Sequence, residues 1–478
     1  MEKKKYFLDI AHMHPVCPLS LSHARIFVLA DVWARWKRKQ EFSVRFPICM
    51  HYSGSTVFKI TSAVSNFLQK RNLNDSDQKT LDLIFNFYKI PKEHLYEFTE
   101  PINVLDYFSD VILKDLRSIQ VSCDYNDYFN TTSQWYQEFV LSVFDIYAEK
   151  RFITTHNNNK SLNYPDSLFR DPAVKRLNET EFSPSTAKAM VTESLRKLDD
   201  EWSFERSDSI GTRIDEYVVD PMFDAEFLGI FNAIYPYLKD LSISQLNARD
   251  IFKEFLHKTE NSNKKVSSVA NELYSHLQEI LPVDIFFVER HLQNWIAKRI
   301  YTETILLPPN ISTHKYFFLG SITNSGQVDS ASRGYGMTLS HLLEIVSPIN
   351  ARLSFLYTSD SLWRNHEWEP TVVEQIRKKT HKFINFYKIL KNYEIENYQR
   401  AHAIINKDAI TIESLIGEGR FKKVLHILFD ELPKAIYPLI GRTPTILGKE
   451  NEKLDILDFF LNYFEILCPS LREKLYEN

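Results

Sequence analysis

The stretch CPLSLSHARIFVLADVWARWKRKQ, residues 17–40, decides how the start of the chain folds. Apolar residues recur at helical spacing from Ala24 to Trp36, and Ser22 stands where a helix N-cap is expected. A run of basic residues closes the stretch, at the end where a helix dipole favours cations. These features predict an amphipathic helix over residues 22–40.

Apolar segments rich in β-forming residues flank this helix on both sides. They are KKYFLDIAHM, residues 4–13, and FSVRFPICMHY, residues 42–52. A strand, a helix and a second strand within so short a stretch form a βαβ unit, which implies a parallel sheet. Ligands of such sheets bind outside the carboxyl ends of the strands, so we expect the functional site there.

The rest of the chain alternates between helical and strand-like patterns. Residues 56–151 are mostly helical, and THNNNKSLNYPDSLFRDP, residues 155–172, is a polar break that contains proline. Further strands are predicted at LPVDIFFVE, residues 281–289, and KYFFLGSI, residues 315–322. From Trp363 onward the pattern is helical, apart from a predicted loop at GRTPTILGKENEK, residues 441–453.

Composition restricts the class of protein. The net charge of −4 argues against a broad basic surface for nucleic acid. The four cysteines are far apart and form no CxxC pair, so we expect neither a zinc knuckle nor a disulfide framework. No stretch approaches the roughly 20 apolar residues of a membrane span. We therefore expect a cytoplasmic protein that has no membrane partner, and a monomer.

Four histidines fall at predicted element ends: His12 and His14 after the first strand, His23 at the helix start and His51 after the next strand. Because those ends meet in a parallel sheet, we expect the four to converge on one crevice. They could supply an imidazole base or hold zinc. Packing is the favoured interpretation, since spacing alone does not establish the geometry that zinc needs, and no metal is predicted.

Several segments, taken in order, resemble a known family. They are AHMHPVCPLSLSHARIFVLADVWARWKRKQEFSVRFPICMHYSGS, YKIPKEHLYEFTEPINVLDYFSDVILKDL, EWSFERSDSIGTRI, LPVDIFFVERHLQNW, QVDSASRGYGMTLSHLLEIVSPINARLSFL and FFLNYFEILCPSLREKLYEN. Together they resemble class I aminoacyl-tRNA synthetases, most closely the leucyl-tRNA synthetases of archaeal and eukaryotic type. The resemblance implies an α/β fold: a Rossmann-like parallel-sheet catalytic core with helical insertions, followed by a C-terminal α-helical bundle.

The resemblance also implies a domain organisation. Residues 1–156 would form the first half of the core and residues 184–360 the second half, with the KMSKS-like loop. Residues 361–478 would form a helical domain like the one that binds the anticodon. Between them, residues 157–183 are expected to be a short loop where the family inserts its editing domain.

The family's nucleotide-binding motifs are altered here. Its HIGH motif corresponds to Ser20-Leu21-Ser22-His23, so a serine replaces the glycine on which a base stacks. Its G-x-D element corresponds to Glu289-Arg290-His291, where His291 replaces the aspartate that binds the ribose. Its KMSKS loop corresponds to residues 328–332, in which Ser330 and Ser332 stand without a lysine and Arg333 follows.

By resemblance, the protein would activate an amino acid with ATP and Mg²⁺ and transfer it to tRNA or another acceptor. The amino acid would be leucine or a similar apolar one, bound near His12, His14 and His51. Ser20, His23, Ser330, Ser332 and Arg333 would stand at the reacting phosphates, and Ser20, Ser22, His23, Glu289, His291 and Arg333 would contact ATP. With these contacts altered, we expect ATP to bind weakly or not at all.

Two further functions stay open. One is a noncatalytic paralogue that binds tRNA or a regulatory ligand. The other is a transferase that uses ready-made aminoacyl-tRNA, with Ser20 or Ser22 as acyl acceptor and His23 as the base.

Overall fold

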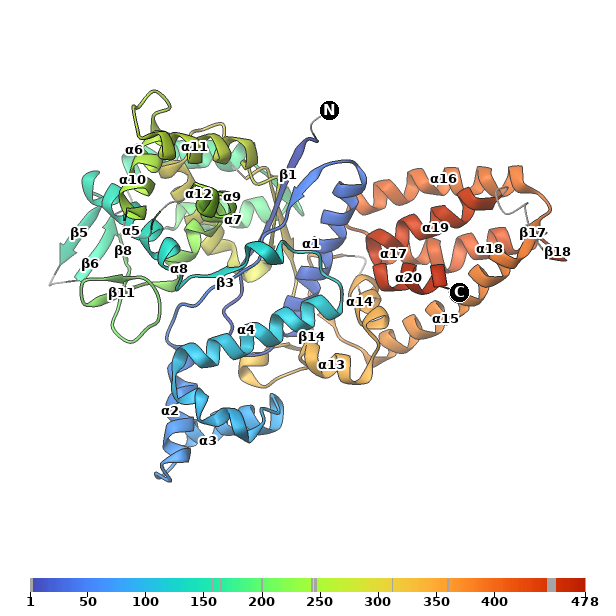
Figure 1. Ribbon diagram of the computed structural model, residues 1–478, viewed down its shortest axis with the longest axis horizontal. Coiled ribbons are helices and arrows are strands. Elements are labelled where there is room, and N and C mark those ends of the chain that lie inside the picture. The colour runs from blue at the N-terminus through green and yellow to red at the C-terminus, as the bar shows by residue number, and fades with distance from the viewer. Residues whose placement is uncertain are drawn as a thin grey trace.

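A parallel five-stranded sheet lies at the centre of the computed structural model (Figure 1). The model describes residues 3–477 except 157–158, 164–165, 199–200, 242–243, 245–246, 312, 359–360 and 445–452. The strand order is β2-β1-β12-β13-β7, and every pairing is parallel. The strands are β1 (Lys5–Ile10), β2 (Ser43–Arg45), β7 (Glu181–Ser183), β12 (Ile285–Glu289) and β13 (Lys315–Leu319).

This strand order places a crevice beside β1. The chain passes from β1 to β2 on one side and later returns to β12 on the other side, so the order reverses between β1 and β12. Ligands of open α/β sheets bind at such a reversal, outside the carboxyl ends of the strands. The predicted Rossmann-like sheet is confirmed, and the crevice lies where Ile10 and Glu289 end the two strands.

Helix α1 (Leu21–Lys39) follows β1, as predicted, but its N-cap differs from the prediction. The N-cap is Ser20, whose hydroxyl accepts a hydrogen bond from the backbone N–H of His23 at 3.3 Å. Ser22 lies in the first turn instead. Both serines suit a cap by residue type, and only Ser20 has the required spacing of three residues to a free N–H.

The segment 42–52 forms two short strands instead of the single predicted strand. Strand β2 pairs with β1, whereas β3 (Cys49–Met50) pairs in parallel with β4 (Phe129–Asn130). Pro47 lies between β2 and β3. A proline has no N–H to donate to a neighbouring strand, which explains why the segment leaves one sheet and joins another.

Residues 56–149 are mostly helical, as the pattern predicted, with the short strand β4 before the last of these helices. The helices include α2 (Thr56–Leu68), α3 (Asp75–Asp82), the π-helix η1 (Leu83–Phe87), α4 (Pro101–Ser118) and α5 (Gln134–Glu149). In Figure 1, α2 and α3 form a lobe below the sheet, while α5 lies with the helices to its left.

The predicted loop at 157–183 is wrong for the residues described there. Strand β6 (Asn159–Asn163) pairs with β5 (Ile153–His156) and β8 (Glu201–Ser203). Helix α6 (Asp166–Glu179) and the sheet strand β7 follow. Scattered apolar residues that the polar composition concealed explain the difference: Leu162, Ala173, Leu177 and Phe182 are all buried in one core cluster.

Residues 187–367 combine helices with two small three-stranded sheets, β10-β11-β9 and β15-β14-β16. The helices are α7 (Ala187–Arg196), α8 (Pro221–Asp224), α9 (Leu228–Asp240), α10 (Ala248–Glu260), α11 (Ser268–Ile280), α12 (Gln293–Leu306), α13 (Leu339–Ile345) and α14 (Pro348–Tyr357). The remaining short strands include β9 (Glu205–Arg206), β10 (Arg213–Ile214), β11 (Tyr217–Val219), β14 (Ile322–Asn324), β15 (Gln327–Val328) and β16 (His366–Glu367).

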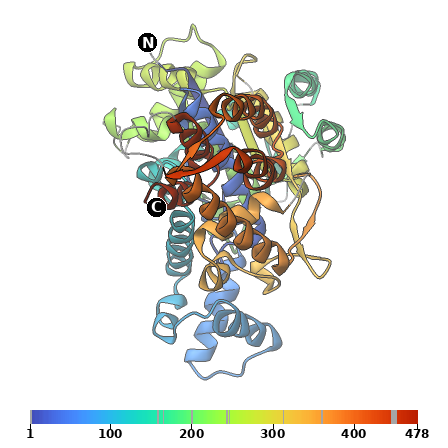
Figure 2. The same ribbon diagram turned by 90° about the vertical axis from the view of Figure 1, so that its right-hand side faces the viewer.

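A helical bundle ends the chain, as predicted (Figures 1 and 2). Its helices are α15 (Pro370–Asn392), α16 (Tyr398–Gly417), α17 (Phe421–His426), α18 (Leu432–Ile436), α19 (Leu454–Leu467) and α20 (Pro469–Glu477). Phe383 packs against Phe429, Phe460 and Phe464 in its core. Of the loop predicted at 441–453, residues 441–444 belong to β18 (Ile440–Pro444), which pairs with β17 (Tyr393–Ile395), and residues 445–452 lie outside the described part.

Candidate functional site

A cavity of about 380 Å³ opens at the carboxyl end of β1. His12, His14 and His51 line it together, with Ser53 and Trp295. Much of the remaining wall is apolar and includes Ala11, Met222, Ala225, Leu228 and Leu292. We call this cavity the histidine pocket. Three of the four predicted histidines meet in it, whereas His23 is not among its lining residues.

His14 presents an unused hydrogen-bond acceptor in the histidine pocket. Its Nδ1 lies 2.9 Å from the backbone carbonyl oxygen of His51, which can only accept, so Nδ1 carries the proton. Burial lowers the pKa of His14 to about 4, so the ring is neutral near pH 7. Its Nε2 is therefore an acceptor, and it is buried without a hydrogen-bond partner among the described residues.

His51 is held by a carboxylate that the sequence analysis did not single out. Its Nε2 donates to Asp224 Oδ1 at 2.7 Å, and Asp224 is fully buried. Burial raises the pKa of Asp224, and His51 opposes that shift. Asp224 lies at the end of α8, far from His51 in sequence and without a recognisable motif, so only the fold brings the two residues together.

His12 has two polar neighbours at one ring nitrogen. Its Nε2 lies 3.1 Å from Asp9 Oδ1 and 2.8 Å from Asn232 Nδ2. The described residues contain no group of three or more His, Cys, Asp and Glu side chains arranged to hold a metal ion. The zinc interpretation of the histidines therefore gains no support from this part of the chain, and His12 has the environment of a packed residue.

The first turn of α1 is occupied by a carboxylate from the KMSKS-like segment. Asp329 accepts from the backbone N–H of Leu21 through Oδ2 at 2.8 Å and from that of Met337 through Oδ1 at 3.0 Å. The Asp329 residue is 6% exposed. A helix N-terminus attracts anions, and here the chain provides its own.

His23 stands beside a second carboxylate. Its Nε2 lies 3.4 Å from Glu289 Oε2, and His291 Nδ1 lies 3.7 Å from the same oxygen. Burial lowers the pKa of His23, but the Glu289 carboxylate outweighs this effect and the net shift is upward. Burial likewise raises the pKa of Glu289, and His23 reverses that shift to a net decrease. The pair thus favours an ionised carboxylate beside a protonated imidazole.

Both serines of the HIGH-like segment are buried and engaged. The Ser20 hydroxyl lies 3.1 Å from His23 Nδ1 and also caps α1. The Ser22 hydroxyl accepts from the backbone N–H of Ile322, at the start of β14, at 2.8 Å. Because Ser20 is 2% exposed and Ser22 is 5% exposed, neither hydroxyl is open to an acyl donor in this conformation.

The remaining predicted phosphate-binding residues lie at the surface. Ser330 Oγ and Ser332 Oγ are 3.4 Å apart, and Arg333 is exposed in the 3₁₀ turn η7 (Ala331–Arg333). No ion pair joins Arg333 to any carboxylate in the described part of the chain. The structure therefore separates these residues from the histidine pocket, which they do not line.

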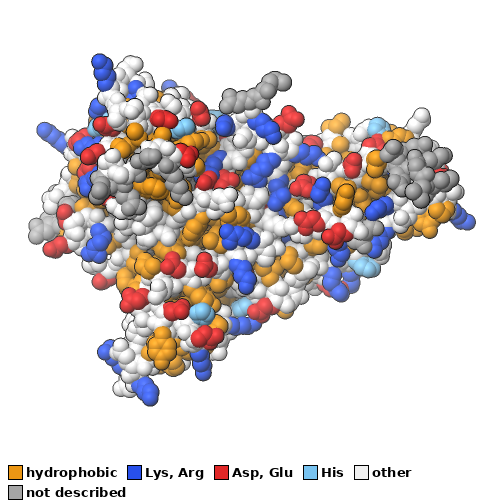
Figure 3. Space-filling model, viewed as in Figure 1, with side chains coloured by type: hydrophobic (Ala, Val, Ile, Leu, Met, Phe, Trp, Pro, Cys, Tyr) orange, Lys and Arg blue, Asp and Glu red, His pale blue; other side chains and the backbone are white. Residues whose placement is uncertain are grey.

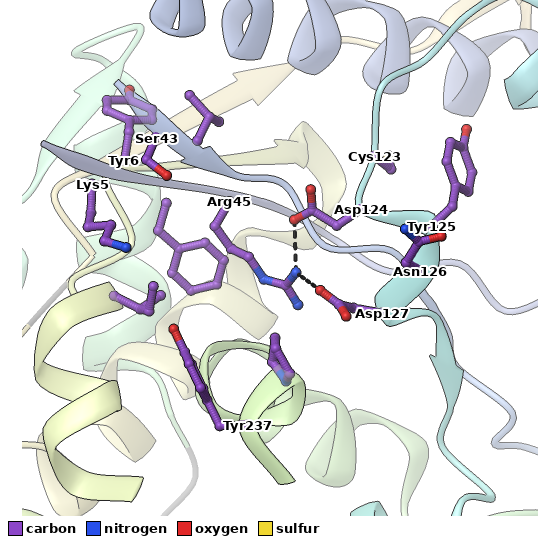
Figure 4. A pocket seen from close by; sticks show the side chains of 14 residues that line it. Lys5, Tyr6, Ser43, Arg45, Cys123, Asp124, Tyr125, Asn126, Asp127 and Tyr237 are labelled. Atoms are coloured by element: carbon purple, nitrogen blue, oxygen red, sulfur yellow. Dashed lines mark hydrogen bonds and ion pairs between the residues drawn. The ribbon is translucent and has the colours of Figure 1, made fainter. Parts of the chain in front are cut away.

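A second cavity, of about 530 Å³, lies beside the amino-terminal half of β1 (Figure 4). Arg45 points between Asp124 and Asp127, and its Nη1 lies 2.9 Å and 2.5 Å from their carboxylates. Its central cation is thus already neutralised by the protein. Since this cavity is also away from the carboxyl ends of the strands, the histidine pocket is the better candidate site.

Comparison with known proteins gives matches in sequence and in structure. No family model matches the chain. The leucine–tRNA ligase 2 of Sulfolobus acidocaldarius is 28% identical over 151 residues, which are 32% of this chain and 15% of that protein. The leucine–tRNA ligase of Archaeoglobus fulgidus is 31% identical over 139 residues, 29% of this chain and 14% of that protein.

The solved structures extend the likeness to the whole fold. Methionyl-tRNA synthetase of Mycobacterium tuberculosis, in complex with methionyl-adenylate, matches with a TM-score of 0.68 at 12% identity and covers 99% of this chain and 93% of that one. The chain has the fold of a class I aminoacyl-tRNA synthetase, as the sequence analysis expected. Part of it is related in sequence to leucine–tRNA ligases, although the match spans only about 15% of the length of those relatives.

Proposed function

We propose that this protein is a synthetase-like protein that binds an amino acid in the histidine pocket and in which ATP-dependent activation is weakened or lost. The observation that carries the first half is the buried, unpartnered Nε2 of His14, which lines the pocket. A buried acceptor without a partner costs free energy, which a donor on a ligand would recover.

The shape and chemistry of the histidine pocket fit an apolar amino acid. The ammonium group of an amino acid would donate a hydrogen bond to His14 Nε2, which has no other partner in the described residues. Leu228, Leu292 and Met222 provide apolar surface for a side chain such as that of leucine. The polar lining residues would therefore face the ammonium and carboxylate groups of the bound amino acid, and the apolar lining residues would face its side chain.

The nucleotide side of the crevice does not fit a triphosphate in the same way. Asp329 and Glu289 place two carboxylates at the first turn of α1 and beside His23, where the resemblance puts the phosphates. These two negatively charged carboxylates would repel a phosphate anion bound at the same place. The exposed Arg333 is the cation that the resemblance assigns to pyrophosphate, and no lysine lies between residues 316 and 368. We therefore derive no catalytic step that uses ATP.

Isothermal titration calorimetry with leucine, isoleucine and methionine tests the binding proposal. Two leucine analogues make the test specific for the ammonium group. Leucinol keeps the ammonium and should bind, whereas N-acetyl-leucine lacks that charged donor and should not. Absence of heat for every amino acid and for leucinol, on folded protein, would contradict the proposal.

A tRNA partner is the second part of the proposed function. The relatives are tRNA ligases by name, and a helical bundle follows the core in this chain as well. We propose tRNA as the partner on these grounds. Filter binding with bulk tRNA, with and without the bound amino acid, tests it. No retention at low salt would leave the protein as an amino-acid-binding regulator.

A further inference from the structure

The strap formed by residues 327–338 contacts the start of α1 near both of its own ends, through Asp329 and Thr338. Leu339 N donates to the carbonyl oxygen of Leu19 at 2.8 Å, directly after the strap, and Thr338 forms an isolated bridge with Ser20. On the other side, Asp329 N donates to the carbonyl oxygen of Ile322 at 2.9 Å. The strap is thus anchored on both sides of the helix N-terminus.

Asp329 is the one carboxylate in this strap, and its position is specific. Its two oxygens take separate amides, one from Leu21 in the first turn of α1 and one from Met337 in the strap. A carboxylate that accepts from helix N-terminal amides uses the same partners as a bound phosphate would. The side chain also closes the strap on itself through Met337.

We propose that Asp329 is an internal anion that occupies the N-terminus of α1 and keeps phosphate groups out of the crevice while the strap is closed. The inference rests on the proposed function in one respect, namely that the start of α1 faces the nucleotide side of the crevice. It adds an autoinhibitory contact to that site. The amino acid reaches the histidine pocket independently, because no strap residue lines that pocket.

Gly336 shows that the strap is built around this carboxylate. Gly336 has a φ of +93°, and a Cβ added there would lie 1.7 Å from Asp329 Oδ1. Only glycine both adopts this backbone conformation readily and leaves room for the carboxylate. Any other residue would have to push Asp329 away from the helix.

A second contact fastens the middle of the strap. Tyr88 donates from its hydroxyl to the carbonyl oxygen of Ala331 at 3.0 Å, next to η1. A Cβ on Gly334, which has a φ of +66°, would lie 2.2 Å from Leu83 Cδ2. The strap therefore packs tightly on η1 and Tyr88 as well as on α1, so its opening requires several contacts to break together.

Two variants of the full-length protein test the proposal by different routes. Asp329→Asn removes the charge but keeps the size of the side chain, and Gly336→Ala displaces the carboxylate without removing it. Gln327→Ala, at an exposed position of the same strap, is the matched control. Calorimetry with inorganic pyrophosphate and with ATP is the readout, and leucine is titrated into each variant to show that the histidine pocket is intact.

We expect wild type and Gln327→Ala to bind neither anion measurably, and both test variants to bind pyrophosphate at least about tenfold more tightly than the weakest affinity that the calorimeter detects, as expected when charged hydrogen bonds become available. Hydrogen exchange should show that the Leu21 and Met337 amides both lose protection in Gly336→Ala, and that one of them loses protection in Asp329→Asn, because an asparagine side chain has a single acceptor oxygen. The proposal is overturned if both variants are folded, bind leucine and gain no affinity for pyrophosphate. It is equally overturned if wild type already binds pyrophosphate at micromolar concentrations. Loss of leucine binding in every protein, wild type included, contradicts the proposed function instead.

Discussion

His14 is the residue on which the proposed amino-acid binding depends most. The carbonyl of His51 fixes its tautomer, and burial keeps its ring neutral. The sequence predicted that His14 lies at the crevice, because it follows a strand whose carboxyl end opens there. Its open Nε2 could not be foreseen, because the tautomer depends on a carbonyl that a neighbouring segment supplies.

We predict that His14→Phe weakens the binding of leucine about tenfold to a hundredfold, because a hydrogen bond to a charged donor contributes about 1.5–3 kcal/mol. Calorimetry measures the dissociation constant. His94→Phe, at an exposed position on another lobe, is the control and should leave it unchanged. An unaltered dissociation constant in His14→Phe would contradict the proposed hydrogen bond between the ammonium group and His14 Nε2.

The pair His23–Glu289 predicts a pH dependence of stability. The raised pKa of His23 contributes stability that is present below its ordinary value of 6.5 and is lost as the pH rises through the folded-state pKa. The lowered pKa of Glu289 contributes stability above its ordinary value of 4.5. The pair should therefore stabilise the fold most between these two values.

Urea denaturation of wild type and Glu289→Gln at about pH 5.5 and about pH 8.5 measures this effect. The midpoint difference between the two proteins should be larger at the lower pH, where His23 is protonated. Glu97→Gln breaks the exposed His94–Glu97 pair and serves as control, with little change at either pH. A difference that grows toward high pH would contradict the assigned pairing.

Among the elements of the fold, helix α1 is joined to helix α14 by a buried ion pair. Asp31 on α1 accepts from Arg352 on α14, from Arg35 at 2.8 Å and from Ser122 N at 2.6 Å. Burial would raise the pKa of Asp31, but Arg352 and Arg35 hold it at about 2. The Asp31 carboxylate is therefore ionised at neutral pH and balances the charge of the buried Arg352.

Asp31→Asn should lower the free energy of unfolding by about 3–5 kcal/mol, because it leaves Arg352 as a buried unpaired charge. Urea denaturation followed by tryptophan fluorescence measures the loss. Glu344→Gln is the matched control, since Glu344 and Lys89 form an ion pair in which both side chains are 55% exposed, and its cost should be about 0–1 kcal/mol. A loss of similar size in both variants would show that the buried pair has no special weight.

The elements that the sequence predicted best are those with long apolar patterns. Strands β1, β12 and β13 and helix α1 are buried along most of their length, so their composition alone identifies them. Strand β6, helix α6 and strand β7 were missed because each contributes only a few apolar residues, such as Leu162, Leu177 and Phe182, to a core that other segments complete.

The candidate site shows the same division. The sequence placed His12, His14 and His51 at one crevice because they follow strands of a parallel sheet, and they do line one pocket. Asp224 and the contact of Asp329 with α1 were not foreseen, since each joins residues far apart in the chain. Such partners are determined by the fold, and no local pattern marks them.

At the scale of the whole molecule, the two ends of the crevice differ in the charge they accept. In the histidine pocket the neutral Nε2 of His14 is open to a donor and Arg299 adds a cation to the wall, whereas Asp329 and Glu289 make the start of α1 unfavourable for anions. On the face drawn in Figure 3, acidic and basic side chains are interspersed, consistent with the net charge of −4. None of the helices in the described part of the chain is long and apolar enough to cross a membrane.

In the proposed function, the protein binds an amino acid but activates it weakly or not at all, and amino-acid-dependent exchange of pyrophosphate into ATP measures activation directly. The account predicts heat of leucine binding without ATP and no exchange above background at saturating leucine, ATP and Mg²⁺. Exchange that depends on leucine and disappears in His23→Ala would contradict the account, because it would show a working nucleotide site at the start of α1.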